Sequence, residues 1–173
     1  MAATRNVFFA LAPPADVRMQ LAREAARLHA AWGGRATAPA KLHVTVLFLD
    51  AFPVPLDPAL VEHARAAGGT IDLPAFELVI DRADRFGRRI GWLGCSAVPA
   101  GLQRLHEALS EAVSGRGVPM RREEAYVPHV TVLRDPRHAA PETIEPVRWR
   151  VEGFALMASG EEEYEVLGAW ALR

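Results

Sequence analysis

Two histidines of this chain lie in identical tetrapeptides, His-Val-Thr-Val, which begin at His43 and at His129. Residues i and i+2 of a β-strand point to the same face, so each histidine would share a face with a threonine, Thr45 or Thr131. The valines would point to the opposite face, where helices can cover them. An imidazole titrates near neutral pH and a hydroxyl donates hydrogen bonds. Two such strands at one cleft suit transfer or hydrolysis at phosphorus, with one imidazole as base, the other as acid, and the hydroxyls on the phosphoryl oxygens.

The length and composition limit the number of domains and the classes of protein that the chain can belong to. The chain has 173 residues, 50% of them hydrophobic, which is enough to bury a substantial core in a single domain over residues 1–173. Its 20 basic and 21 acidic residues nearly balance, which argues against coating of long nucleic acid by phosphate contacts alone but leaves a short or terminal phosphate ligand open. A single cysteine, Cys95, excludes an internal disulfide and fits a reducing compartment. No signal-peptide pattern is present and no apolar run approaches the ~20 residues of a membrane span, so we expect a cytoplasmic protein.

Hydrophobic periodicity predicts a mixture of helices and strands. Helices are expected over residues 15–32, 57–67 and 99–113. Strands are expected over residues 6–11, 42–49, 76–81, 90–96, 127–134, 147–157 and 164–172. Alternating polar and apolar residues favour antiparallel sheets with one face on helices and the other open. Each histidine strand has a helix and further strands in its own half of the chain. We therefore expect a bilobal α+β fold, with two antiparallel-rich sheets facing a central cleft and the helices packed outside.

The paired motifs and their surroundings resemble the two-histidine phosphoesterase superfamily, and within it the RNA 2′,3′-cyclic phosphodiesterases once called 2′-5′ RNA ligases. The resemblance covers nearly the whole chain. Besides the two tetrapeptides it includes VFFALAPP at residues 7–14, LFL at 47–49, WLG at 92–94, the Pro128-His129 step, Arg134, and YEVLGAW at 164–170. One position departs from the pattern, because Asp50 stands where the family usually has glycine.

The resemblance implies hydrolysis of a terminal 2′,3′-cyclic phosphate to a 2′-phosphomonoester, with no metal ion or other cofactor. It makes His43 the proton donor to the leaving 3′ oxygen and His129 the proton acceptor from water, although the symmetric motifs alone do not distinguish acid from base. Thr45 and Thr131 would bind the non-bridging oxygens. The expected partner is RNA with a 2′,3′-cyclic phosphate end or a small cyclic nucleotide, with 2′-5′ RNA ligation as the reverse reaction. A monomer is the simplest assembly.

Two further side chains are candidates for substrate binding. Arg134 stands where the family has a basic residue and would reach the phosphate or the adjoining nucleotide. Strict alternation would place it with Val132, away from the cleft, so this role requires the strand to end or bulge first. Phe48 is a candidate to stack on a base, as is Phe86. Since both are apolar residues in or beside strands, a place in the core is an equally good interpretation.

Alternatives to acid–base catalysis stay open. We interpret the other four histidines as solvated or packed: His29, His63, His106 and His138. A zinc site is disfavoured because neither motif has a second histidine or a carboxylate at ligand spacing. A non-catalytic module that binds RNA ends or a nucleotide would use the same cleft. It would tolerate the loss of one imidazole, whereas an acid–base enzyme would not.

Overall fold

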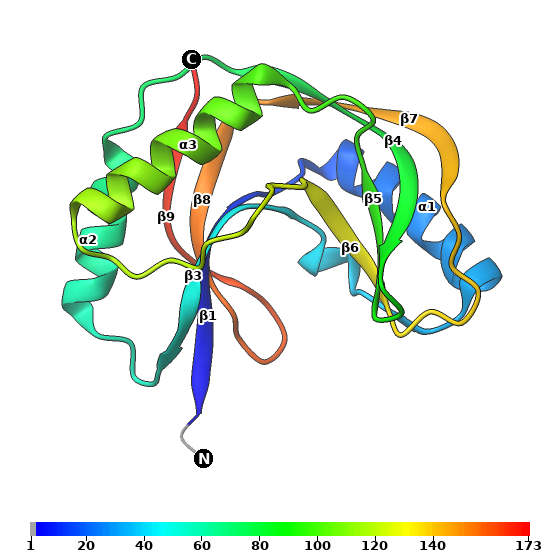
Figure 1. Cartoon of the computed structure of the whole chain (residues 1–173), viewed down its shortest axis with the longest axis horizontal. Helices are drawn as coiled ribbons and strands as arrows, with labels where there is room; N and C mark the ends of the chain where they lie inside the picture. The colour runs from blue at the N-terminus through cyan, green and yellow to red at the C-terminus, as the bar shows by residue number, and fades with distance from the viewer. Residues whose placement is uncertain (1–2) are drawn as a thin grey trace.

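The computed structural model describes residues 3–173, which form three α-helices, one short 3-10 helix and a nine-stranded sheet (Figure 1). The helices are α1 (Ala15–Trp32), α2 (Pro58–Gly69) and α3 (Ala100–Gly115), with the 3-10 helix η1 at Pro39–Lys41. The strands are β1 (Thr4–Leu11), β2 (Arg35–Ala36), β3 (Val44–Pro53), β4 (Phe76–Phe86), β5 (Ile90–Gly94), β6 (His129–Arg134), β7 (Glu142–Val151), β8 (Gly153–Ala158) and β9 (Glu165–Ala171). The predicted α+β class is therefore confirmed, and none of the helices described is long and apolar enough to cross a membrane.

The strands form a sheet in the order β7-β4-β5-β6-β3-β1-β8-β9, with β2 paired to β6, and every pair in residues 3–173 is antiparallel. Its two halves meet at β3 and β6, which share only the residue pair Val44–Val130. Figure 1 shows the halves bending toward each other as an arch. The two sheets expected from the sequence are thus hydrogen-bonded into one at the two motif strands.

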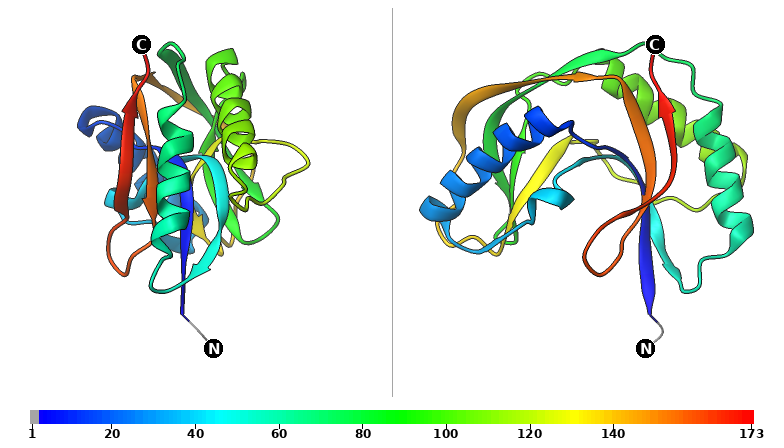
Figure 2. Two further views of the ribbon diagram at one scale, coloured as in Figure 1. Left: turned by 90° about the vertical axis from the view of Figure 1, so that its left-hand side faces the viewer. Right: turned by 180° about the vertical axis from the view of Figure 1, so that it is seen from behind.

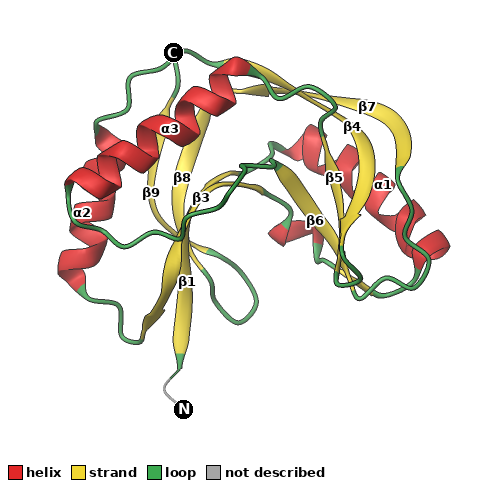
Figure 3. Cartoon of the chain, in the orientation of Figure 1, coloured by secondary structure: helices red, strands yellow, loops and turns green. Residues whose placement is uncertain are grey.

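The helices lie on the outer side of the arch, as expected. Helices α2 and α3 contact β3, β8 and β9 of one half, and α3 also reaches β4 of the other half. Helix α1 contacts β2, β6 and β7 of that other half. Helix α1 lies behind its half of the sheet in Figure 3 and in front of it in the right-hand view of Figure 2. Its buried stripe has the predicted spacing, with Val17, Leu21, Ala25, Leu28 and Trp32 facing the core.

The expectation that each half of the chain forms one lobe is wrong. The chain passes from β1 in one half of the sheet to α1 under the other, and then returns in β3. It crosses again between α2 and β4, and between β7, which pairs with β4, and β8, which pairs with β1. The lobes are therefore interlaced, because strand pairing over long sequence separations decides which helix covers which half.

The single strand expected over residues 147–157 is also wrong, since the structure has two strands separated at Glu152. Buried and exposed residues alternate along much of β7, which has one open face, while Phe154 to Ala158 of β8 are all buried. Gly153 follows the break, and a Cβ there would lie 2.8 Å from the carbonyl oxygen of Trp170. The change in burial pattern at this glycine marks the crossing between the halves.

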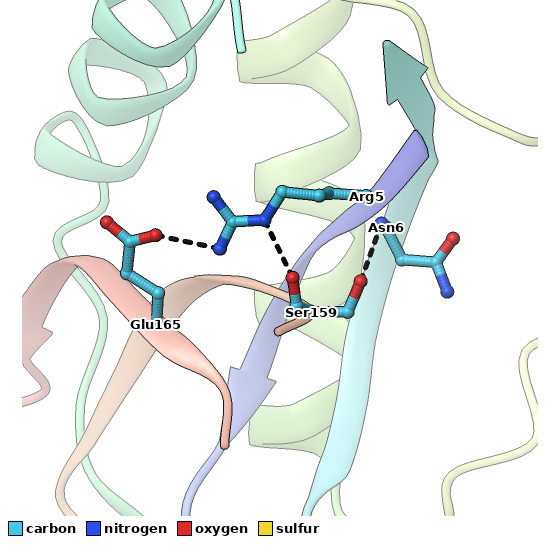
Figure 4. Close-up of polar contacts among 4 residues, drawn as sticks. All are labelled: Arg5, Asn6, Ser159 and Glu165. Carbon is cyan, nitrogen blue, oxygen red and sulfur yellow. Dashed lines mark hydrogen bonds and ion pairs between the residues drawn. The ribbon is translucent and has the colours of Figure 1, made fainter. Parts of the chain in front are cut away.

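The loop between β8 and β9 is held at both ends by one arginine (Figure 4). Arg5 Nε donates to the carbonyl oxygen of Ser159 at 2.7 Å, and its guanidinium contacts the Glu165 carboxylate at 2.7 Å. The backbone N–H of Asn6 donates to the Ser159 hydroxyl at 2.9 Å. This clamp fixes the loop beside the open face of the sheet, where Tyr164 lies.

Candidate active site

The two His-Val-Thr-Val motifs lie side by side at the centre of the sheet. Val44 pairs with Val130, and continuing this antiparallel register by one residue places His43 opposite Thr131 and Thr45 opposite His129. Residues directly opposite in an antiparallel pair share a face, with Cβ atoms about 5 Å apart. The four valines of the motifs are fully buried and the histidines and threonines only half-buried. The predicted division of faces is confirmed, and two imidazoles and two hydroxyls form one patch on the open face.

Each motif strand bulges at the same position. On β3, Phe9 and Ala10 pair with Leu47 and Thr45, so Val46 is an extra residue. On β6, Gly91 and Trp92 pair with Leu133 and Thr131, so Val132 is the extra residue.

Because of the bulge, two consecutive apolar residues of each strand face the core, and the next side chain returns to the open face. That next residue is Phe48 in the first repeat and Arg134 in the second. The bulge that the role of Arg134 required is therefore present, and Phe48 and Arg134 occupy equivalent positions in the two repeats.

The backbone orients both imidazoles in the same way. His43 Nδ1 lies 2.8 Å from the carbonyl oxygen of Lys41, and His129 Nδ1 lies 2.8 Å from that of Val127. A carbonyl oxygen only accepts, so Nδ1 carries the hydrogen and the Nε2 atom of the neutral ring is free to accept a proton. His43 Nε2 is 3.1 Å from the Thr45 hydroxyl, which donates to it, whereas His129 Nε2 has no hydrogen-bond partner within residues 3–173.

Aromatic side chains pack against each imidazole in a matched arrangement. Phe8 of β1 stacks on His43 with ring centroids 5.1 Å apart, and Tyr164 meets the same imidazole edge-on at 5.0 Å. Phe86 meets His129 edge-on at 4.8 Å, and Trp92 of β5 lies 6.0 Å away. Both rings are thereby held at their places on the sheet, and Phe86 is a neighbour of a motif histidine. Phe8 and Tyr164 belong to segments that carry the family resemblance, but the sequence pattern did not assign them a contact.

Burial is the main influence on the pKa of both histidines and lowers it below the ordinary value of 6.5. The backbone carbonyls that accept from Nδ1 act in the opposite direction and raise it. Nearby charges affect the pKa values of the two histidines in opposite directions. His129 and Arg18 lower the pKa of His43 further, whereas the Glu123 carboxylate raises the pKa of His129. In the unliganded protein, these charges favour a proton on His129 over one on His43.

Two cavities meet at the motif residues. The larger, which we call the His43 cavity, has a volume of about 810 Å³ and is lined by His43, Thr131 and Arg134, among others. The smaller, the His129 cavity, has a volume of about 300 Å³. Thr45 and Phe48 line both cavities. All six site residues predicted from the sequence therefore line one or both of these two cavities.

Tyr126 and His106, to which the sequence assigned no functional role, hold the free edge of β3. Beyond Val44 this edge has no partner in β6, and the two side chains bond to its carbonyl oxygens instead. The Tyr126 hydroxyl donates to Thr45 at 2.9 Å and His106 Nδ1 to Val46 at 2.7 Å, with the two rings stacked 4.1 Å apart. They fix the backbone that carries Thr45. The interpretation of His106 as packed is confirmed, while His29, His63 and His138 are exposed.

Within residues 3–173, no group of three or more histidine, cysteine, aspartate or glutamate side chains is placed to hold a metal ion. The side chains that line the two cavities include two imidazoles, two threonine hydroxyls and a guanidinium.

Comparison with known proteins adds an independent line of information. The family model of the 2′-5′ RNA ligase superfamily matches residues 13–163. An RNA 2′,3′-cyclic phosphodiesterase of Escherichia coli (strain K12) is 33% identical over 181 residues, covering 99% of each chain. The crystal structure of E. coli LigT complexed with 3′-AMP is 30% identical with a TM-score of 0.82, covering 98% of this chain and 99% of that one. A protein of Thermus thermophilus, at 23% identity and a TM-score of 0.76 over 97% of this chain and 98% of that one, shares the fold.

Proposed function

Because the chain belongs to the 2′-5′ RNA ligase superfamily, as its paired motifs predicted, we propose that it hydrolyses RNA or nucleotide 2′,3′-cyclic phosphates to 2′-phosphomonoesters. The observation that carries the proposal is the placement of two His-Thr pairs around Val44–Val130 on one face of the sheet. The name of the E. coli relative and the 3′-AMP in the similar LigT structure support a nucleotide substrate. Residues 1–173 would act as one catalytic domain.

In the proposed reaction, His129 Nε2 takes a proton from water, and the water oxygen attacks phosphorus. The bond from phosphorus to the 3′ oxygen breaks, and His43 donates its proton to that oxygen, which leaves the phosphate on the 2′ oxygen. Thr45 and Thr131 donate hydrogen bonds to the non-bridging oxygens as charge develops there. His129 suits the role of base because its Nε2 has no partner among residues 3–173 and can receive a water. Phe48 would stack on the base, and 2′-5′ ligation is the same path in reverse.

The assignment of acid and base follows the family resemblance, while the charges of the unliganded site favour the opposite proton distribution. The two distributions contain the same number of protons and interconvert, so the pair titrates as a unit. Bound cyclic phosphate, an anion beside His43, would favour the imidazolium there.

The direct test is incubation of the protein with the four nucleoside 2′,3′-cyclic phosphates and a short RNA with a cyclic phosphate end, in the presence of EDTA. We expect 2′-monophosphate products and rates that EDTA leaves unchanged, because no step of the proposed mechanism uses a metal ion. Chromatographic separation of the 2′ and 3′ isomers reads out the reaction and its regiochemistry together. Strict metal dependence would contradict the mechanism, and tight binding without turnover would favour the RNA-end or nucleotide-binding module.

The pH dependence should show the lowered pKa values of the two histidines. We expect a bell-shaped profile, because one ring must be protonated and the other neutral. For kcat/KM, which reports the free enzyme, burial shifts the optimum below about 6.5, the ordinary value for histidine. Bound cyclic phosphate is an anion and favours the imidazolium, so the kcat profile should lie at higher pH. Initial rates measured between about pH 4.5 and 8.5 give the pH profiles of kcat/KM and of kcat. A kcat/KM optimum at higher pH than the kcat optimum would contradict the expected effect of the bound anion on the histidines.

The cytoplasmic location and the monomeric state expected from the sequence stay predictions.

A further inference from the structure

We propose that Tyr126 and His106 are positioning residues for the reaction, which hold the Thr45 hydroxyl where it can bind a phosphoryl oxygen, through hydrogen bonds to the backbone of β3. The inference rests on the proposed function and deepens it, because it names two residues outside the motifs on which the rate depends. Both act through Thr45 and need no contact of their own with the reacting phosphate.

The first support is that the free edges of the two motif strands are held in different ways. Past their single shared residue pair, β3 and β6 are no longer bonded to each other. On β6, strand β2 pairs with the vacant edge, and the backbone N–H of Thr37 donates to the carbonyl oxygen of Val132 at 2.9 Å. On β3 the equivalent carbonyl oxygen, that of Val46, accepts from His106 Nδ1 at 2.7 Å. A side chain thus holds β3 where the main chain holds β6.

The second support is that this part of β3 carries site residues. The Tyr126 hydroxyl donates to the carbonyl oxygen of Thr45 itself at 2.9 Å. Within residues 3–173, main-chain bonding from the segment before β6 resumes only at residues 48–49, whose carbonyl oxygens accept from the N–H of Arg121. The bulge at Val46 falls in the stretch between, and a bulge interrupts the regular ladder of hydrogen bonds. The position of this stretch on its free side therefore depends on two side chains.

The third support is that the two side chains form one preorganised unit. His106 lies on α3 and Tyr126 precedes β6, and their rings stack in parallel with centroids 4.1 Å apart. Burial raises the pKa of the Tyr126 hydroxyl, so it stays protonated and can donate at any pH at which the enzyme would work. Each ring limits the movement of the other, and both donors are fixed before substrate binds.

A small shift of this backbone would matter because the Thr45 hydroxyl has two partners to serve. It lies 3.1 Å from His43 Nε2 in the unliganded site, and in the proposed reaction it donates to a phosphoryl oxygen. A misplacement of about 1 Å in a reacting site can cost up to about 10²-fold in rate. The loss would fall on kcat more than on KM, because the hydrogen bond to the phosphoryl oxygen strengthens as charge develops.

Tyr126→Phe removes the hydroxyl and keeps the stacked ring. We expect it to lower kcat about tenfold while KM changes less than about twofold. His106→Leu should have an effect of similar size, whereas His106→Asn keeps an N–H donor near the place of Nδ1 and should keep most of the rate. Thr70→Val is the control, because it removes a hydroxyl that donates to a backbone carbonyl oxygen at 2.7 Å at the end of α2, outside both cavities. It should leave kcat unchanged.

A double-mutant cycle tests whether Tyr126 acts through Thr45. In a Thr45→Val background the hydroxyl to be positioned is gone, so adding Tyr126→Phe should lower kcat little further. Urea unfolding of each variant shows that the protein measured is folded. If the losses of the two substitutions multiply instead, Tyr126 does not act through Thr45 and the proposal is overturned.

Nuclear magnetic resonance of the histidine rings tests the positioning without turnover. Tyr126→Phe exchanges one neutral side chain for another, so the charges of Arg18 and His129 that act on His43 stay in place. A looser Thr45 hydroxyl stabilises the neutral ring of His43 less, and His43 should titrate at higher pH in this variant. If no cyclic phosphate is hydrolysed but this shift is found, the proposed reaction fails and the positioning stands. Wild-type kcat together with a wild-type titration of His43 in Tyr126→Phe would overturn the positioning.

Discussion

Replacing either His43 or His129 by alanine is expected to lower kcat for a nucleoside 2′,3′-cyclic phosphate by about 10²- to 10⁴-fold, the usual range for the loss of a general acid or base. Each ring has its Nδ1 bonded to a backbone carbonyl oxygen, which leaves Nε2 as the atom for proton transfer, and alanine has no group that can replace it. The double variant should lose little more than the worse single variant, because the two groups act in one step. Steady-state kinetics of the three variants measures the effect.

Two controls separate catalysis from folding. His63→Ala removes an exposed imidazole on α2 and should retain wild-type kcat, while circular dichroism should show the same fold for all variants, since the buried valines of both motifs remain. A substrate with sulfur in place of the bridging 3′ oxygen tests which histidine is the acid, because a thiolate leaves without a proton. That substrate should restore much of the rate to His43→Ala and little to His129→Ala. The reverse result would exchange the two roles, and near-normal turnover of either variant with the oxygen substrate would contradict acid–base catalysis.

The division of faces in the motifs could be predicted because it depends only on local geometry. Side chains alternate between the two faces of a strand, and Val44 and Val130 must be buried. The histidines and threonines must therefore lie on the opposite, open face. Helix α1 could be predicted with the same certainty, because its apolar stripe is long and glycine follows it. In both cases the information lies within a few consecutive residues.

The bulges show where strict alternation fails. A regular strand would turn Arg134 away from the cleft, and the structure reverses this through the extra residue Val132. The sequence does contain a signal, since Leu follows the second valine in both copies, at Leu47 and Leu133. Two adjacent apolar residues in an otherwise alternating strand are compatible with a bulge. Only the pairing of both strands with their neighbours shows that each has one.

Contacts between distant parts of the chain left no such local signal. Tyr126 reaches the carbonyl oxygen of Thr45 across 81 residues of sequence, and Arg35 is brought beside Arg134 by the pairing of β2. Both depend on how the interlaced lobes assemble. The order of strands follows from long-range pairing, in which β8 joins β1, and no periodicity within one segment encodes that choice.

Removing the hydroxyl from Thr45 or Thr131 by substitution with valine, which has nearly the same shape, is expected to lower kcat by about 10²-fold, as the loss of one donor to a developing oxyanion does. The effect on KM should be smaller, because the hydrogen bond strengthens as charge builds on the phosphoryl oxygen. Thr45→Ser and Thr131→Ser retain the hydroxyl and should retain most of the rate. Losses below about threefold in both valine variants would show that the hydroxyls do not contact the reacting phosphate.

The two threonines should nevertheless differ in one respect. Only Thr45 donates to a histidine in the unliganded site, at 3.1 Å from His43 Nε2, and a hydrogen bond to the neutral ring opposes its protonation. Burial is the main reason that the pKa of His43 is low. Thr45→Val removes a hydrogen bond that stabilises the neutral ring, and the pKa of His43 should therefore rise. The kcat/KM profile of Thr45→Val should shift to higher pH relative to the wild type, while that of Thr131→Val keeps its position. Equal profiles for the two variants would mean that this hydrogen bond does not influence the protonation of His43, even if both hydroxyls stabilise the transition state.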